Sequence, residues 1–418
     1  MSAGAGFAET ALYNKLKPDD YPAWYEQQLW GLYDVPHYVR NLFNLPVVAY
    51  SGEIDKQIQA ARVMEDAFRS QRRILPHVIG PGVGHKYEPD ALAEVLRHID
   101  QAVRRGRNRL PKKVSLQTRT LRYSKMFWVE ALRLQEHWRE ARIDAEIVGP
   151  GDFRVATKNV QALRLDPGQE MDTALVVIDG QRLRVPRASE PRTTATFIKG
   201  ADGWQPMNPD RRHAGLEKVP GLQGPIDDVF MEPFLVVTPT GKAQHDRVQK
   251  WVEFELSHFQ DRWRSLFRGE LRTKPDVEVD DDDISKFHLI LWGDPSSNQI
   301  LRRVAASPGA LHQLPIQWTP EQLRVGTRVF SAERHVPVMI YPNPLQPAKY
   351  IVINSGPTFR EAHDRTNSLQ NPKLPDWAVI DLNQPPTEEA PGRIAAADFF
   401  DEEWKIKESG DKNQESDN

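Results

Sequence analysis

Two stretches near the start of the chain share one pattern of apolar and polar positions. In each, an apolar run ("LPVVAY" or "LPHVIG") is followed by a polar turn and then by apolar residues at helical spacing. The first helical set runs from Ile58 to Phe68 and the second from Leu92 to Ile99. Apolar runs without polar alternation are typical of parallel strands that are covered on both faces. The pattern therefore predicts an α/β segment over residues 1–105.

Two or three parallel strands are visible in this segment. A parallel sheet so small cannot bury both of its faces, so we expect it to need further strands on one side. The opening "SAGAGF" has the small residues that are typical of a buried strand end and the loop after it. Without neighbouring strands, the segment should expose apolar faces and open edges.

The pattern changes at about residue 112, after a basic run, "RRGRNRLPKK", that is typical of a solvated linker. Short strands separated by turns follow, including "TALVVIDGQRLRV", in which Asp179-Gly180 is typical of a hairpin turn. Several such strands at short intervals predict an antiparallel β-sandwich over residues 112–205. We expect Trp128 and Trp138 to fill its core or edge and not to bind a ligand.

Residues 221–385 return to α/β order and predict a smaller α/β domain. The strand "PFLVV" leads to a helix whose expected buried side carries Trp251, Phe254, Leu256, Phe259, Trp263 and Phe267. "HLILW", "VPVMIYPN", "KYIVINSG" and "WAVIDL" supply further strands. The acidic run "DVEVDDDD" is expected to be an exposed loop, and the polar tail, residues 404–418, to be disordered. The predicted fold class is α/β with an all-β insert.

Composition narrows the possible chemistry. The chain has 418 residues, enough for two or three domains, with 39% apolar and 27% charged residues, as in ordinary soluble proteins. A net charge of −3 gives no reason to expect nucleic acid as a partner, and the absence of cysteine removes disulfides, thiolate metal sites and a cysteine nucleophile. The apolar runs are too short to span a bilayer, and the N-terminus does not resemble a secretory signal. The histidines lack metal-ligand spacing, so we expect neither a metal nor a cofactor.

Asp55 and His85 stand in the two polar turns of the first segment. In open α/β sheets the loops at the carboxyl ends of the strands carry the functional residues. An acid on one such loop can hold the Nδ1 of a histidine on the next, so that Nε2 faces a nucleophile. Gly82 and Gly84 would free the backbone ahead of His85. On spacing alone, a second interpretation is as good: Asp55 caps the following helix and His85 makes an ordinary loop hydrogen bond.

The same residues carry a family resemblance. "NLPVVAYSGEIDKQIQAARVMEDAF" followed by "LPHVIGPGVGHKY" resembles the end of the catalytic domain of bacterial prolyl-oligopeptidase-like serine hydrolases, which belong to the α/β-hydrolase superfamily. "GLQGPIDDVFMEPFLVVTPTG" and "NPKLPDWAVIDL" look like the C-terminal extension of large multidomain members. The resemblance implies a partial α/β-hydrolase sheet in residues 1–105 and hydrolysis of a peptide or ester bond through an acyl-serine. It gives Asp55 the role of triad acid and His85 that of general base.

The sequence departs from this family at the nucleophile. The family needs a serine in a G-x-S-x-G elbow that follows a strand and precedes the acid, and no such motif occurs in the sequence. Ser2 has no preceding strand, Ser51 lies on the acid's own loop and is expected to make a local cap, and Ser355 lies in another domain. We therefore expect a serine peptidase or esterase truncated after its elbow and nearly inert by itself.

A protein of another class remains as the alternative. In it, the β-sandwich and the C-terminal domain bind a polymer or partner, and the hydrolase segment is vestigial. Elsewhere, Ser296, Ser297 and Asn298 stand at an expected helix N-terminus, where helix capping is favoured over anion binding. The sequence assigns neither the substrate, the oligomeric state nor the compartment, although large relatives of the family are often exported.

Overall fold

The computed structural model describes residues 2–3, 6–149, 151–168, 174–185, 193–207, 215–306 and 314–407. These residues form a mixed α/β structure with several separate sheets. Contacts divide the chain into two compact units. The first holds Met1–Pro22, Trp30–Arg212 and Val219–Gly221, and the second holds Ala23–Leu29, His213–Lys218 and Leu222–Asn418.

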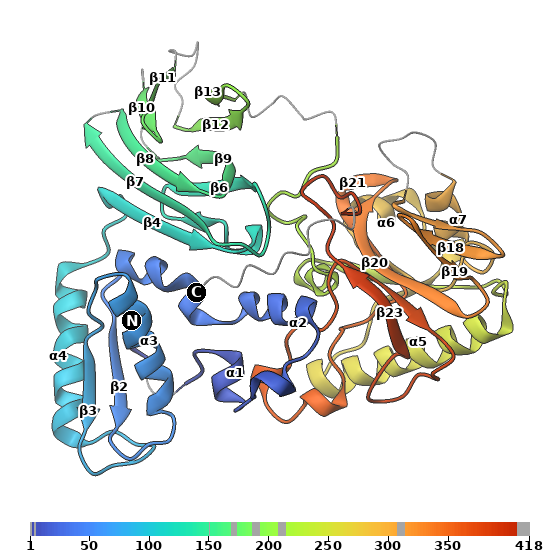
Figure 1. The fold of residues 1–418 in the computed structure, drawn as a ribbon, viewed down its shortest axis with the longest axis horizontal. Helices are drawn as coiled ribbons and strands as arrows, with labels where there is room; N and C mark the ends of the chain where they lie inside the picture. Colours follow the sequence, from blue (N-terminus) through green and yellow to red (C-terminus); the bar gives the residue numbers. More distant parts are fainter. Residues whose placement is uncertain are drawn as a thin grey trace. The chain divides into compact units, whose positions relative to one another are not determined.

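The first unit opens with a small parallel sheet in the order β1-β2-β3. Its strands are β1 (Ser2–Ala3), β2 (Val48–Gly52) and β3 (His77–Gly80), so both predicted strands are present and "SA" of the opening "SAGAGF" forms a strand beside them. Helix α3 (Ile58–Ser70) joins β2 to β3, and α4 (Pro89–Arg105) follows β3 (Figure 1). The predicted strand–helix–strand–helix order is confirmed.

Helices cover both faces of this sheet, although it is small. Alternate residues of β2 point to opposite faces. Val48 and Tyr50 belong to a cluster with Val95 of α4, whereas Ala49 belongs to a cluster with Phe68 of α3. The expectation that the sheet could not bury its faces is therefore wrong for β2, all of which is buried. Apolar residues are still exposed outside β2, with 68% of Ile54, 90% of Ile74 and 71% of Val103 accessible.

Short helices lead from β1 to β2. They are α1 (Thr10–Tyr13), η1 (Pro18–Asp20), α2 (Trp24–Leu29), η2 (Trp30–Leu32) and η3 (Val35–Asn44). Helix α2 belongs to the second unit, where the Trp24 ring contacts Phe399 and Lys373 pairs with Glu26 at 2.7 Å. Residues 1–105 are therefore not one contiguous domain.

The all-β part of the first unit consists of two five-stranded sheets, ordered β11-β10-β8-β7-β4 and β13-β12-β9-β6-β5. Their strands are β4 (Lys113–Thr118), β5 (Lys125–Met126), β6 (Val129–Leu134), β7 (Ala141–Gly149), β8 (Asp152–Lys158), β9 (Val160–Leu165), β10 (Ala174–Ile178), β11 (Gln181–Val185), β12 (Ala195–Gly200) and β13 (Gly203–Pro206). Side chains of both sheets, with Trp128, share one core.

Two details of this part bear on the sequence analysis. Asp179-Gly180 forms the turn between β10 and β11, with φ of 49° and 88°, as the hairpin prediction requires. The prediction of purely antiparallel pairing is wrong, because β10 pairs with β8 in parallel. The intervening strand β9 lies in the other sheet, so β10 returns to its sheet in the direction of β8.

Polar side chains of η3 join the small parallel sheet region to the all-β part. Arg40 pairs with Asp144 of β7 at 2.6 Å, and the side chain of Asn44 accepts a hydrogen bond from Ser115 N at 2.9 Å. Asn41 makes the equivalent contact with Gln117 N at 2.7 Å. These bonds explain why regions that the sequence analysis separated at residues 105–112 lie in one compact unit.

The second unit is built on a seven-stranded sheet ordered β15-β14-β16-β21-β20-β22-β23, with a separate sheet β17-β18-β19. Strands β15, β14, β16 and β21 are parallel and the others antiparallel. The elements are η5 (Ile226–Met231), β14 (Phe234–Thr238), α5 (Asp246–Phe267), β15 (Thr273–Pro275), η6 (Asp276–Glu278), α6 (Asp281–Lys286), β16 (His288–Leu291), α7 (Gln299–Ala305), β17 (Ile316–Trp318), β18 (Gln322–Val325), β19 (Arg328–Ser331), β20 (His335–Asn343), β21 (Gln346–Ile353), η7 (Glu361–His363), η8 (Asn367–Leu369), β22 (Trp377–Asp381) and β23 (Arg393–Asp398).

Three expectations for this unit need correction. In α5, Trp251 and Phe259 are buried as predicted, but Phe254 and Phe267 are exposed. The acidic run forms η6 and α6, not a loop, and Asp280 caps α6 with its side chain. The tail cannot be disordered from residue 404, because Trp404 is fully buried against Tyr341 and Phe400; residues 408–418 lie outside the described residues.

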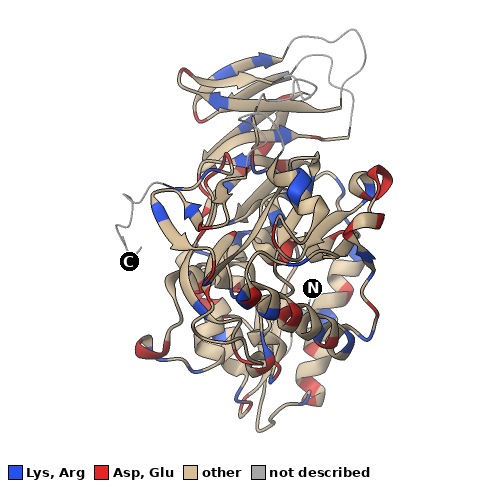
Figure 2. Ribbon diagram, turned by 90° about the vertical axis from the view of Figure 1, so that its right-hand side faces the viewer, with Lys and Arg blue, Asp and Glu red and all other residues tan. Residues whose placement is uncertain are grey.

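Charges of both signs are interspersed along the chain (Figure 2). This distribution agrees with the formal net charge of −3. Of the helices in the described parts, none combines the length and hydropathy of a membrane span.

Candidate active site

The loops after β2 and β3 are hydrogen-bonded to each other. Glu53 N donates to Gly80 O at 2.8 Å, and Ile54 N donates to Val83 O at 3.1 Å. In return, Gly82 N donates to the Glu53 carboxylate at 2.8 Å. Because both loops leave the carboxyl ends of adjacent parallel strands, they meet at one edge of the sheet, as the sequence predicts.

Two glycines make this close approach possible. Gly82 has a φ of 62°, in the left-handed region that glycine adopts without strain. A Cβ added to Gly52 would lie 2.1 Å from the Gly84 carbonyl oxygen, so no other residue fits there. Gly84 itself has open space around its Cα and no positive φ, so the predicted backbone freedom is needed at Gly82 and not at Gly84. Sequence reasoning overlooked Gly52.

Asp55 and His85 form a hydrogen-bonded pair. The His85 Nδ1 lies 3.1 Å from the Asp55 Oδ2. Asp55 is 7% exposed, whereas the His85 side chain is 68% exposed. A carboxylate can only accept, so the proton of neutral His85 lies on Nδ1 and the Nε2 lone pair is free on the solvent side.

The second interpretation of Asp55 is also correct in part. Its other oxygen, Oδ1, accepts a hydrogen bond from Gln57 N at 2.9 Å, just before α3 begins. One carboxylate therefore holds both the start of the helix and the histidine. Its two oxygens have separate partners, so the local turn does not compete with the pairing to His85.

Tyr50 fixes the far end of the histidine loop. Its hydroxyl donates to Lys86 O at 2.8 Å and accepts from Glu88 N at 2.9 Å. Glu88 in turn caps α4 by accepting from Ala91 N at 2.8 Å. Tyr50 is buried in β2, and no motif marks it in the sequence, because the contact depends on which face of the strand it occupies.

The candidate serines do not reach His85 in the described residues of the first unit. The side chain of Ser2 lies outside the described residues. Ser51 is 1% exposed, and its hydroxyl lies 3.0 Å from the Nε2 of a different histidine, His77. The Nδ1 of His77 lies 3.1 Å from Glu65 Oε1. The prediction that Ser51 makes a local cap is wrong: it belongs to a serine–histidine–glutamate chain between β2, β3 and α3, in which Ser51 and the His77 side chain are buried and the Glu65 side chain is 32% exposed.

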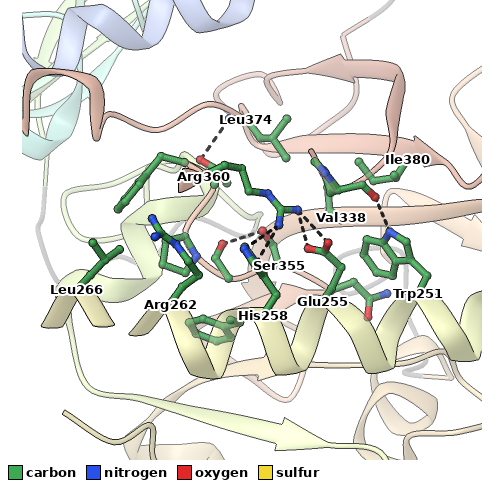
Figure 3. Close-up of a pocket in the computed structure, with 17 residues that line it drawn as sticks. Trp251, Glu255, His258, Arg262, Leu266, Val338, Ser355, Arg360, Leu374 and Ile380 are labelled. Atoms are coloured by element: carbon green, nitrogen blue, oxygen red, sulfur yellow. Dashed lines mark hydrogen bonds and ion pairs between the residues drawn. The ribbon is translucent and has the colours of Figure 1, made fainter. Parts of the chain in front are cut away.

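Ser355 lines a small pocket in the second unit, between α5 and the segment that follows β21 (Figure 3). The pocket has a volume of about 40 Å³. The Ser355 hydroxyl donates to Gly356 O at 2.9 Å. His258, the nearest histidine of the pocket wall, is occupied at both nitrogens: Nδ1 accepts from Arg360 at 2.8 Å and Nε2 lies 2.8 Å from Glu361. His258 therefore has no free lone pair with which to activate Ser355.

An ion-pair network makes up the polar wall of this pocket. Arg360 binds the Glu255 carboxylate with two hydrogen bonds of 2.9 and 2.7 Å, and Arg262 pairs with Asp364 at 2.6 Å. Burial raises the pKa of Glu255, while the Arg360 guanidinium acts in the opposite direction. The charged groups are paired with one another, so the wall is built mainly for rigidity.

The remaining candidate of the sequence analysis is a helix cap. The Asn298 side chain accepts from Ile300 N and Leu301 N at 3.0 Å each, at the start of α7. Ser296 and Ser297 donate through their backbone N–H groups to Asp294. Capping, the favoured interpretation, is confirmed. Among the described residues, no group of three or more acidic or histidine side chains is arranged to hold a metal ion.

Comparisons of the chain with protein-family models, with curated proteins and with solved structures find no match. The function therefore has to be argued from the residues and their geometry.

Proposed function

We propose that the chain is part of a serine hydrolase of the prolyl-oligopeptidase-like family, in the α/β-hydrolase superfamily, that cleaves peptide or ester bonds through an acyl-serine. The observation that carries this proposal is the Asp55–His85 pair, with a 3.1 Å contact and an exposed imidazole. Its position, on adjacent loops at the carboxyl edge of a parallel sheet, is the one that this chemistry uses.

The two residues have distinct roles in this proposal. Asp55 orients the imidazole and stabilises the imidazolium that forms when His85 accepts the proton of the serine hydroxyl. His85 then returns that proton to the leaving group, and in deacylation it activates water in the same way. Glu53, Gly82 and Tyr50 hold the two loops, so the imidazole does not have to be ordered during each turnover.

The nucleophile has to come from a G-x-S-x-G elbow that the 418 residues do not contain. The chain by itself should therefore be nearly inert toward serine-directed reagents. An oxyanion hole would also be incomplete, because it usually includes the backbone N–H after the nucleophile.

Fluorophosphonate labelling tests this function. We expect no labelling of the 418-residue chain and stoichiometric labelling of a longer product of the same reading frame that carries the elbow. Stoichiometric labelling of the 418-residue chain, or a longer product without an elbow, would contradict the proposal. Mapping the labelled residue distinguishes an elbow serine from Ser51 and Ser355.

A binding protein without catalysis is the second candidate function. The pocket between α5 and the segment after β21 favours it, because an apolar floor with a few fixed polar groups is typical of ligand sites. Its volume of about 40 Å³ is well below that of ordinary ligand pockets, so it limits the ligand to one small group, such as the end of a short side chain. Binding of short peptides, followed by calorimetry, should be abolished by Leu266→Trp, at a half-buried residue of the pocket wall, if this pocket is used and unchanged if it is not.

A further inference from the structure

Lys218 and Asp376 form an ion pair that is completely buried in the second unit. The Lys218 Nζ lies 2.7 Å from the Asp376 Oδ2, and both side chains are 0% exposed. Lysine is almost never fully buried in proteins, because its ammonium group loses its hydration. The pair joins residues 158 positions apart: Lys218 lies before η5, and Asp376 directly precedes β22.

The surroundings hold the two groups in one orientation. The Lys218 Nζ also donates to Phe400 O at 3.1 Å and lies 5.2 Å from the centre of the Trp404 ring. The Asp376 Oδ2 accepts a second hydrogen bond from Phe400 N at 3.0 Å. The other oxygen, Oδ1, is buried and has no hydrogen-bond partner in the described residues. A Cβ on Gly224 would lie 2.1 Å from Oδ1, so the carboxyl group is also in close contact with the backbone.

From this arrangement we propose that Lys218 and Asp376 condense to an isopeptide bond. In a site closed to solvent, transfer of the ammonium proton to the carboxylate converts two buried charges into a neutral amine and a neutral acid. The Nζ lone pair then attacks the Asp376 carbonyl carbon, the C–O bond breaks, and the hydroxyl leaves as water with a proton from the amine. One C–N bond forms and one water leaves, so no oxidant, cofactor or second protein is required.

Two further polar side chains lie close to the pair. Gly224, which touches Asp376, donates its N–H to the Tyr350 hydroxyl at 3.1 Å, and that hydroxyl donates to Asp228 at 2.9 Å. Tyr350 and Asp228 are themselves buried.

A second lysine–acid pair in the same unit provides an internal comparison. Lys373 and Glu26 are also 2.7 Å apart, but their side chains are 12% and 19% exposed. Because this pair is partly exposed, its charges keep part of their hydration. We therefore expect the amide bond at Lys218 and none at Lys373. In a chain without cysteine, this amide would be the covalent cross-link that closes the second unit.

Mass spectrometry of the purified chain tests the proposal without any variant. The intact protein should be lighter than its sequence mass by one water molecule, about 18 Da. Trypsin should fail to cleave after Lys218 and should release a branched peptide that joins residues 213–242 to residues 374–393. The branched peptide separates this outcome from a succinimide at Asp179-Gly180 or Asp202-Gly203, which loses the same mass within one linear peptide.

Recovery of the linear peptide that ends at Lys218 in stoichiometric yield, with a folded protein, would overturn the proposal. The variant Asp376→Asn supplies a second check, because its amide would form the same bond with loss of ammonia, about 17 Da. Lys218→Arg should restore the full sequence mass. If this variant does not fold, the mass and peptide map of the unchanged chain still decide the question.

Discussion

The first unit contains two histidine–carboxylate pairs in the segment that runs from β2 to the loop after β3, and they differ in accessibility. In both, an imidazole Nδ1 lies 3.1 Å from a carboxylate oxygen: Asp55 for His85, and Glu65 for His77. The His77 side chain is 2% exposed and its Nε2 is occupied by Ser51, whereas the His85 side chain is 68% exposed. Equal pair geometry therefore does not mean equal function.

The difference arises from position along the strand. His77 is the first residue of β3, paired in register with Ala49, and its side chain packs toward α3. His85 lies five residues beyond the end of β3, on a loop that Glu53 and Tyr50 hold at the sheet edge. The serine–histidine–glutamate chain joins β2 and β3 to α3, while no described residue forms a hydrogen bond with the Nε2 of the histidine on the adjoining loop.

The largest expected difference in acylation rate is between two single variants, in which one or the other histidine is replaced by alanine. In a longer product that carries an elbow, His85→Ala should slow fluorophosphonate acylation by about four to six orders of magnitude, because the proposed general base is lost. His77→Ala should lower stability and leave the rate of the folded fraction within about tenfold, as expected for a group that acts only through packing. Equal losses in both variants would show that His85 is structural.

Substitution of the two carboxylates should give the same contrast in acylation rate, with a large loss at Asp55 and a small one at Glu65. Asp55→Asn keeps its one oxygen for Gln57 N and turns an NH₂ donor toward the His85 Nδ1, which favours the wrong tautomer, so acylation should fall by about 10⁴-fold with little change in the fold. Glu65→Gln keeps a hydrogen-bond acceptor for His77 and should have little effect on the rate. Single-turnover labelling at fixed pH measures both; a normal rate for Asp55→Asn would remove the acid from the mechanism.

Two glycines of the same loops give a smaller, structural contrast. Gly52→Ala places a Cβ against the Gly84 carbonyl oxygen and should destabilise the first unit by about 1–3 kcal/mol while displacing His85. Gly84→Ala meets open space, and we expect a change within about 0.5 kcal/mol. Denaturant unfolding of the two variants measures the difference. Similar stabilities would mean that the loops do not approach each other as described.

The smallest effect is the pH dependence of a third histidine, His37, which forms no ion pair with a carboxylate among the described residues. Burial, with a contribution from Arg119, lowers the pKa of His37 to about 4, and burial raises the pKa of the nearby Asp34 to about 6. The stability that neutral His37 provides is present above pH 6.5 and is lost as the pH falls through 4. Asp34 acts in the opposite sense: its contribution is present below 3.8 and is lost as the pH rises through 6.

As the pH falls from 6 to 4, the unchanged chain should lose stability because His37 resists protonation in the folded state. His37→Gln removes this loss, so the variant should become more stable relative to the unchanged chain over this range. The difference should be at most about 2 kcal/mol. Urea unfolding midpoints across this range measure it. If the variant and the unchanged chain have parallel pH profiles, His37 is not a buried neutral group.

Much of the fold could be predicted because apolar runs without polar alternation mark strands covered on both faces. β2, β3, β14, β16, β20, β21 and β22 all occur where such runs stand. Pairing across the chain was not predictable in the same way. The parallel contact of β10 with β8 and the packing of α2 in the second unit depend on distant surfaces. The burial of Trp404 depends on rings contributed by β20 and by Phe400.

The part of the candidate site that could be predicted is the part that depends on where residues stand relative to the ends of the strands. Asp55 and His85 each follow a strand, so their meeting at one sheet edge was expected from the strand order alone. Gly52 and Tyr50 were missed, because their roles depend on a contact between loops and on the face of β2 to which a side chain points. Ser51 was assigned to a cap because its partner, His77, lies 26 residues further along the chain.

The claim on which this account depends is that Asp55 holds neutral His85 with its Nε2 unprotonated and open to solvent. Long-range ¹H–¹⁵N spectra of the histidine rings in the 418-residue chain test it directly, with His85→Gln used for assignment. The account predicts that neutral His85 carries its proton on Nδ1 and that Asp55→Asn shifts this preference. A His85 ring protonated on Nε2, or one that does not respond to Asp55→Asn, would contradict it.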